Sequence, residues 1–175
     1  MPKFAFTFLI LLSFLFAAAV QAQPVTFPSI KSQDLNGTAV NLPHDFRGKA
    51  NLVIFAFKRR QQGQVDTWLP AAKKLARRYK RFDYYELPAV GDRSRLMKSI
   101  IDNGMRSGIR DTDTRGRTIT LYTPKKPLMD KLGMPHDRTI YALLLDSRNR
   151  VVWRADGAAT ADKIAALNAA VAAAL

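Results

Sequence analysis

Two short runs of alternating apolar and polar residues flank Asn36-Gly37 near the start of the chain. An Asn-Gly pair readily adopts the positive φ angles of a tight turn, so residues 27–42 are predicted to form a β-hairpin. Residues 52–57 are apolar without interruption, which is typical of a strand buried on both faces of a sheet.

The segments that follow alternate between helical and extended patterns. Residues 65–81 place apolar side chains at helical spacing and predict an amphipathic helix. Residues 82–87 are rich in aromatic side chains and predict the next strand. A second helix is expected over 93–105, with Gly104 near its end as a helix terminator. Residues 107–117 carry charges and two glycines without a period, so we expect an exposed loop there.

The last third of the chain predicts three more strands and two helices. Residues 118–122 are β-branched and aromatic and predict a strand, and residues 125–132 predict a short helix. Residues 139–145 form a second buried apolar run, which pairs with residues 151–154 in a predicted hairpin.

The alanine-rich segment 161–174 predicts a closing helix, and Thr160 is a good N-cap for it. The order of elements predicts an α/β fold, with a mixed β-sheet flanked by helices on both faces and an N-terminal β-hairpin.

The first 22 residues have the three parts of a secretory signal peptide. Lys3 provides the positive charge, an apolar stretch covers residues 4–16, and small residues lead to Ala22. We therefore predict cleavage after Ala22, a single domain at 23–175, and a periplasmic location. The apolar residues 4–20 are slightly shorter than the roughly 20 residues of a membrane-spanning helix, so an uncleaved membrane anchor is the alternative.

The chain contains no cysteine, so it forms no disulfide and performs no thiol chemistry. It has 28 Lys and Arg residues against 14 Asp and Glu residues, and a net charge of +13 remains after removal of Lys3. A charge of this size bears on partners rather than on the fold. In the periplasm the available polyanions are phospholipid head groups, lipopolysaccharide and acidic proteins, and no nucleic acid is expected.

The predicted mature chain resembles the thioredoxin-like superfamily, in its peroxiredoxin and TlpA-type branch. The resemblance includes residues 34–37, residues 45–49, the buried strand and the following helix, where Pro70 matches the proline that kinks this helix in thioredoxins. Counting back from Pro70, the family's Cys-x-x-Cys motif falls on Gln62, Gly63, Gln64 and Val65. The resemblance thus implies the fold without its chemistry, because disulfide exchange requires a thiolate.

A closer resemblance is to a thioredoxin-like family of mitochondrial factors needed to assemble the membrane sector of ATP synthase. It is seen in the glutamine-rich turn and tryptophan helix at 61–68, and again at 141–146, 150–154 and 157–159. It implies a non-redox role in membrane-protein assembly.

Two groups of cations are candidate binding sites. The first follows the carboxyl end of the buried strand, where open α/β sheets gather their sites, and could receive a phosphate or carboxylate; it comprises Lys58, Arg59 and Arg60. The alternative is a solvated basic loop. The second is the outer face of the helix at 65–81, which could dock on an anionic surface through Lys73, Lys74, Arg77, Arg78 and Lys80.

The sequence offers no organised nucleophile or base. His44 and His136 each lie beside an aspartate in a predicted loop, and no third ligand shows metal spacing. We therefore expect no catalytic residue, metal or cofactor, and predict an exported, non-redox binding or assembly-assisting protein whose partner is an envelope or membrane protein. The alternatives are a basic protein that docks on anionic lipid or lipopolysaccharide, and a cysteine-independent enzyme built on residues 58–62.

Overall fold

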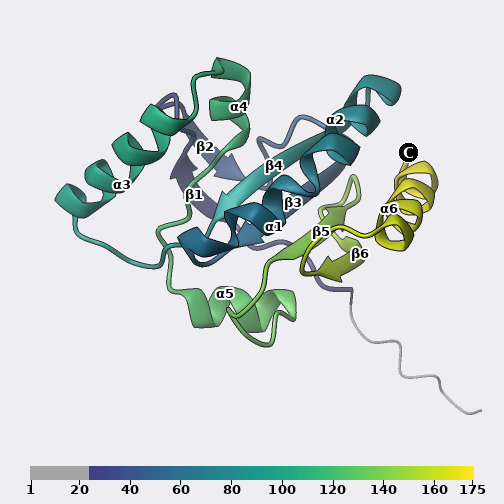
Figure 1. The fold of residues 1–175 in the computed structure, drawn as a ribbon. Coiled ribbons are helices and arrows are strands. Elements are labelled where there is room, and N and C mark those ends of the chain that lie inside the picture. Colours follow the sequence, from purple (N-terminus) through teal and green to yellow (C-terminus); the bar gives the residue numbers. More distant parts are fainter. Residues whose placement is uncertain (1–23) are drawn as a thin grey trace, which may run out of the picture.

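A computed structural model describes residues 24–175. The predicted signal peptide and its cleavage site lie outside these residues. The described part contains a four-stranded sheet in the order β4-β3-β5-β6. The strands are β3 (Ala50–Ala56), β4 (Phe82–Pro88), β5 (Tyr141–Leu145) and β6 (Val151–Asp156). β3 pairs in parallel with β4 and antiparallel with β5, which pairs antiparallel with β6. The predicted mixed sheet is thereby confirmed (Figure 1).

Both faces of the sheet are covered, as the uninterrupted apolar pattern of β3 requires. On one face Leu52 and Ile54 belong to a core cluster with Trp68 and Leu167. This cluster involves α1 (Gln62–Asp66), α2 (Leu69–Arg78) and α6 (Ala161–Ala174). On the other face Val53 and Phe55 pack in a second cluster that includes residues of α5 (Lys125–Leu132) and of the N-terminal segment.

The N-terminal hairpin is confirmed as β1 (Ile30–Gln33) paired antiparallel with β2 (Ala39–Leu42). Gly37 adopts a φ of 88° in the connecting turn, a conformation that glycine reaches at little cost. The predicted N-cap is also confirmed, because the Thr160 hydroxyl accepts a hydrogen bond from the backbone N–H of Lys163.

The helix predicted over 65–81 is divided into two. A 3₁₀ turn, η1 (Arg59–Gln61), leads into α1, and α2 begins only at Leu69. Pro70 lies in the first turn of α2. Backbone N–H groups in the first turn have no partner within the helix, so proline, which lacks this group, costs no hydrogen bond there. The proline therefore marks the start of the second helix.

Three predictions between residues 104 and 122 are wrong. α3 spans Arg95–Gly108 and continues past Gly104, and the expected loop contains α4 (Thr112–Arg117). The Asp111 carboxylate caps α4 by accepting a hydrogen bond from the N–H of Thr114 at 2.7 Å. Residues 118–122 form no regular strand; Thr118 makes an isolated parallel bridge to Glu86 of β4, and Leu121 makes one to Ala89, just after β4.

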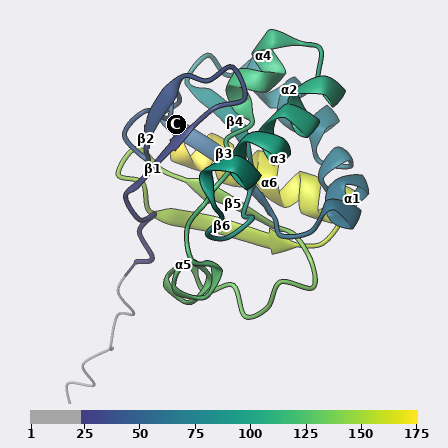
Figure 2. The same ribbon diagram turned by 90° about the vertical axis from the view of Figure 1, so that its left-hand side faces the viewer.

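α3 stands beside the sheet rather than on it. Figures 1 and 2 show it next to the hairpin and α4, on the opposite side of the molecule from α6. None of its fourteen residues is buried. No helix within residues 24–175 is long and apolar enough to cross a membrane.

Candidate functional site

The four residues at the family's redox position lie at the start of α1, close to the end of β4. Gln62 is exposed, and its side-chain Nε2 donates hydrogen bonds to Asp66 Oδ1 at 3.0 Å and to Glu86 Oε2 at 3.3 Å. Val65 is buried in the core, and Gln64 Oε1 accepts a hydrogen bond from the Thr139 hydroxyl at 3.3 Å. Gly63 is exposed. Amide and alkyl groups at these positions provide hydrogen bonds and packing, not a nucleophile.

The neighbouring glutamine, Gln61, has a structural role that the sequence did not reveal. Its side chain is buried and its Oε1 accepts hydrogen bonds from the backbone N–H groups of Phe57 and Lys58, at 2.7 and 3.1 Å. Its Nε2 donates to the Asp137 carbonyl at 2.9 Å. Gln61 thus ties the end of β3 to the loop before β5. Nothing in the sequence distinguishes it from the exposed Gln62.

The three cations proposed to bind an anion are not equivalent. Lys58 Nζ forms an ion pair with Asp137 Oδ1 at 2.7 Å, and this contact lowers the pKa of the Asp137 carboxyl. Arg59 and Arg60 are exposed in η1. Anion binding stays a prediction, and it rests on these two arginines because Lys58 already has a partner within the fold.

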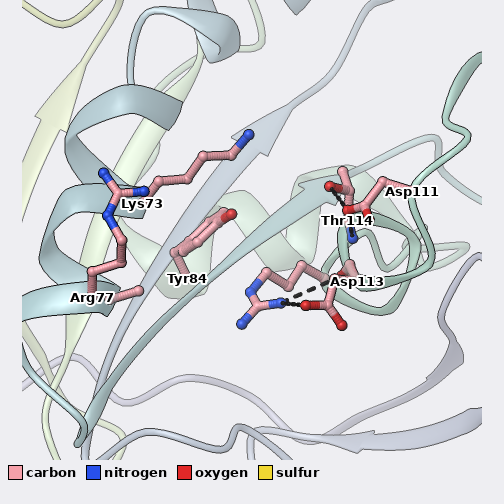
Figure 3. A pocket seen from close by; sticks show the side chains of 8 residues that line it. Lys73, Arg77, Tyr84, Asp111, Asp113 and Thr114 are labelled. Carbon is pink, nitrogen blue, oxygen red and sulfur yellow. Dashed lines mark hydrogen bonds and ion pairs between the residues drawn. The ribbon is translucent and has the colours of Figure 1, made fainter.

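The five cations of the candidate docking face are all exposed. Lys73 and Arg77 line a hollow of about 240 Å³ opposite Asp111 and Asp113 (Figure 3). Arg117, which also lines this hollow, pairs with Asp83 at 3.0 Å. The charge of this side of α2 is therefore partly balanced. Docking on an anionic surface remains a prediction, carried mainly by Lys74, Arg78 and Lys80.

A larger groove of about 730 Å³ joins the redox position to α3. Three parts of the chain line this groove. The first is the end of β3 and the turn after it, including Lys58, Arg59 and Gln62; the second is the end of β4 and the residues after it, Ala89 and Val90. The third is one side of α3 together with Ile109, the residue after it. The apolar wall on α3 consists of Ile100, Ile101 and Met105. Gly104 and Gly108 also line the groove; Gly104 precedes Met105, and Gly108 is the last residue of α3. Nothing in the sequence pattern of α3 points to this groove, because its lining comes from residues that are distant along the chain.

Glu86 is the only acidic residue that lines this groove. It is 8% exposed, and burial raises the pKa of its carboxyl, while the hydrogen bond from Gln62 acts in the opposite direction. The salt bridges within residues 24–175 do not include Glu86. Glu86 is thus a buried carboxyl that lines the groove and has no salt bridge of its own, although Lys58 and Arg59 line the same groove and the charge of Lys73 acts to lower its pKa.

We expect Glu86→Gln to stabilise the protein at pH 7. Because the folded state raises the pKa of Glu86, it binds the proton more tightly than the unfolded chain does, and wild-type stability falls as the pH rises above about 4.5, the ordinary value. The variant escapes this loss, so its advantage should disappear below that pH. Urea unfolding at pH 7 and pH 4 measures the difference. The control Asp156→Asn removes the charge of an exposed acid on β6, and an equal gain in both variants would contradict the assignment.

Residues 24–175 contain no group of three or more His, Cys, Asp or Glu side chains placed to hold a metal ion.

Several solved structures share the fold of this chain. The thioredoxin domain of a thiol-disulfide oxidoreductase from Bacteroides vulgatus is 20% identical, with a TM-score of 0.57, and the match covers 85% of this chain and 98% of that one. A putative thiol:disulfide interchange protein DsbE from Chlorobium tepidum is 16% identical, with a TM-score of 0.55 and coverages of 87% and 97%.

The exposed lipoprotein thioredoxin of Streptococcus pneumoniae is 15% identical, with a TM-score of 0.56 and coverages of 83% and 99%. At these identities the likeness establishes a thioredoxin-like fold and not an activity. The predicted thioredoxin-like fold is thereby confirmed, in a chain that has no cysteine.

Among curated proteins no sequence matches significantly. A family model, described as ATP10 protein, matches residues 18–173, which is most of the chain. The match includes the glutamine-rich turn, the tryptophan helix and the C-terminal segments on which the closer resemblance was based. The chain belongs to the ATP10 protein family.

Proposed function

We propose that this protein assists the assembly of membrane proteins in the cell envelope, by holding an apolar helix of a client protein in the groove beside α3. It does so without redox or other catalytic chemistry. Family membership supports this proposal, because the resemblance described above links the family to assembly of the membrane sector of ATP synthase. A periplasmic location is part of this proposal, and the signal peptide predicted from residues 1–22 supports it.

The observation that carries the proposal is the unpartnered apolar side of α3. Leu96, Met97 and Ile100 are 73%, 44% and 56% exposed. Contiguous exposed apolar surface on a folded domain marks an interaction site, because burying it against a partner is favourable. Of these three residues only Ile100 lines the groove, where Ile101 and Met105 extend the apolar wall, and this wall favours an apolar occupant.

The two glycines of α3 favour a helix as that occupant. A Cβ atom at Gly104 or Gly108 would meet nothing within 4 Å, and neither glycine has a positive φ angle. The fold itself therefore does not require glycine, although Gly104 in the helix interior costs about 1 kcal/mol relative to alanine. Small residues four apart allow a partner helix to approach closely, as between membrane-spanning helices.

A client segment is not expected to bind as an additional β-strand on β4, the strand whose end lines the groove. β4 is the edge strand of the sheet, but its carboxyl half already accepts hydrogen bonds from residues 118–121. Ile119 N–H donates to the Glu86 carbonyl at 2.9 Å, and Leu121 N–H donates to the Pro88 carbonyl at 2.8 Å. A client segment can thus contact side chains in the groove but cannot extend the sheet there, which again favours a helix.

A binding assay with a defined probe tests this function. The probe is a fluorescent twenty-residue peptide of leucine and alanine, kept in solution by a mild detergent, and binding is measured by fluorescence anisotropy. We expect the wild-type protein to bind it and Ile100→Glu to bind about tenfold more weakly or worse, because a charge would be buried without a partner.

Val152→Glu is the matched control, since Val152 is 48% exposed on β6, outside the groove. Its affinity for the peptide should stay within about twofold of wild type, as expected of a charge that remains in solvent. Failure of the wild type to bind, or equal weakening by both substitutions, would contradict the proposed function.

A further inference from the structure

We propose that the groove selects client helices that carry an arginine, whose guanidinium binds the Glu86 carboxylate beside the Gln62 amide. This inference rests on the proposed function and specifies the chemistry of the client. It gives Gln62, at the position of the family's first cysteine, a role in binding.

Glu86 differs from the other buried acids of residues 24–175 in having no arginine. Asp83 pairs with Arg47 at 2.9 Å and with Arg117 at 3.0 Å. Asp146 pairs with Arg150 at 2.6 Å. Both therefore have a counter-charge within the fold, as buried carboxylates normally do. Glu86, although 8% exposed, has only the neutral Gln62 amide as a hydrogen-bond partner.

The two side chains leave acceptor capacity for a ligand. Gln62 Nε2 is occupied by Asp66 Oδ1 and Glu86 Oε2, and within residues 24–175 no hydrogen bond is made to the Gln62 Oε1 or to the Glu86 Oε1. Both residues line the groove. A carboxylate with an amide oxygen close by suits a donor with several N–H groups, and the planar guanidinium of arginine offers five.

Filling the groove favours this pairing over a carboxylate without a partner. An apolar helix against Ile100, Ile101 and Met105 would displace water from Glu86, and a carboxylate left without water or a cation is strongly disfavoured. An arginine on the helix supplies the missing charge. Such a helix also needs protection before it is assembled, because an arginine at the centre of a bilayer costs about 3 kcal/mol or more.

Two probes that differ in one residue test the inference. Both are the leucine/alanine peptide, with either arginine or its neutral analogue citrulline at the centre. We expect wild-type protein to bind the arginine peptide about tenfold more tightly than the citrulline peptide. Glu86→Gln should bind both with the affinity that wild type has for the citrulline peptide. Asp113→Asn, a change at an exposed acid outside the groove, should keep the wild-type preference.

The outcomes separate the two proposals. Equal binding of both peptides by wild-type protein would overturn the arginine inference and leave the proposed function intact. A preference that survives in Glu86→Gln would also overturn the inference, because it would assign the selectivity to another group. Binding of neither peptide by the wild type would overturn the proposed function, and the inference with it.

Discussion

Replacing Trp68 by alanine is expected to lower the free energy of unfolding by about 3–5 kcal/mol. The Trp68 side chain is fully buried, in the cluster between the sheet and helices α2 and α6. Its indole N–H donates a hydrogen bond to the Gly157 carbonyl at 3.0 Å. Its ring packs edge to face against that of Trp153, with 5.9 Å between the ring centroids. The substitution would open a cavity and leave the carbonyl of Gly157 without this donor.

Because domains of this size are stable by only about 5–15 kcal/mol, this is one of the largest losses expected from a single change. Urea unfolding followed by circular dichroism measures it. Trp153→Ala is the matched control, since Trp153 lies on β6 and is only half-buried, and it should cost distinctly less. Equal losses for the two variants would show that Trp68 is not the centre of this core.

Elements with strong local signals could be predicted from the sequence. The Asn36-Gly37 turn needs no distant residue to define it, and the apolar run of β3 requires cover on both faces wherever the strand lies. Thr160 caps α6 through a bond three residues away. In each case the physical cause lies within a few residues of the element.

The errors occurred where local signals were weak or ambiguous. The sequence pattern predicts Gly104 as a helix terminator, but Gly104 has no positive φ angle and α3 continues to Gly108. α4 is six residues long and lacks an apolar period, although Asp111 three residues before Thr114 is a capping signal that could have revealed it. The β-branched segment 118–122 makes only isolated bridges to its neighbours, which no propensity could foresee.

The candidate site was the hardest part to predict, because it depends on contacts between distant residues. The pairing of Lys58 with Asp137 spans 79 positions and changes the interpretation of the basic loop. In the sequence Glu86 is one acid in an aromatic strand, and only the fold shows that it is buried and faces a groove. The match to the redox motif identified Gln62 from the sequence, but only the structure shows its hydrogen bond to Glu86.

The central claim is that the side of α3 facing the groove contacts an apolar helix of a membrane protein. Site-specific photocrosslinking in intact cells tests it most directly, with a photoreactive residue placed in turn at Ile100, at Lys74 on the outer face of α2, and at Val152 on β6. Gly104→Leu, combined with the probe at Ile100, fills the groove in a position where a Cβ meets nothing within 4 Å.

We predict adducts from Ile100 whose crosslinked peptides map to a membrane-spanning segment of the client, and we predict that Gly104→Leu abolishes them. Val152 should give no such adduct. The account would be contradicted if Ile100 gave none while Lys74 did, because the basic face of α2 would then be the contact surface, or if the adducts of Ile100 mapped only to water-soluble domains.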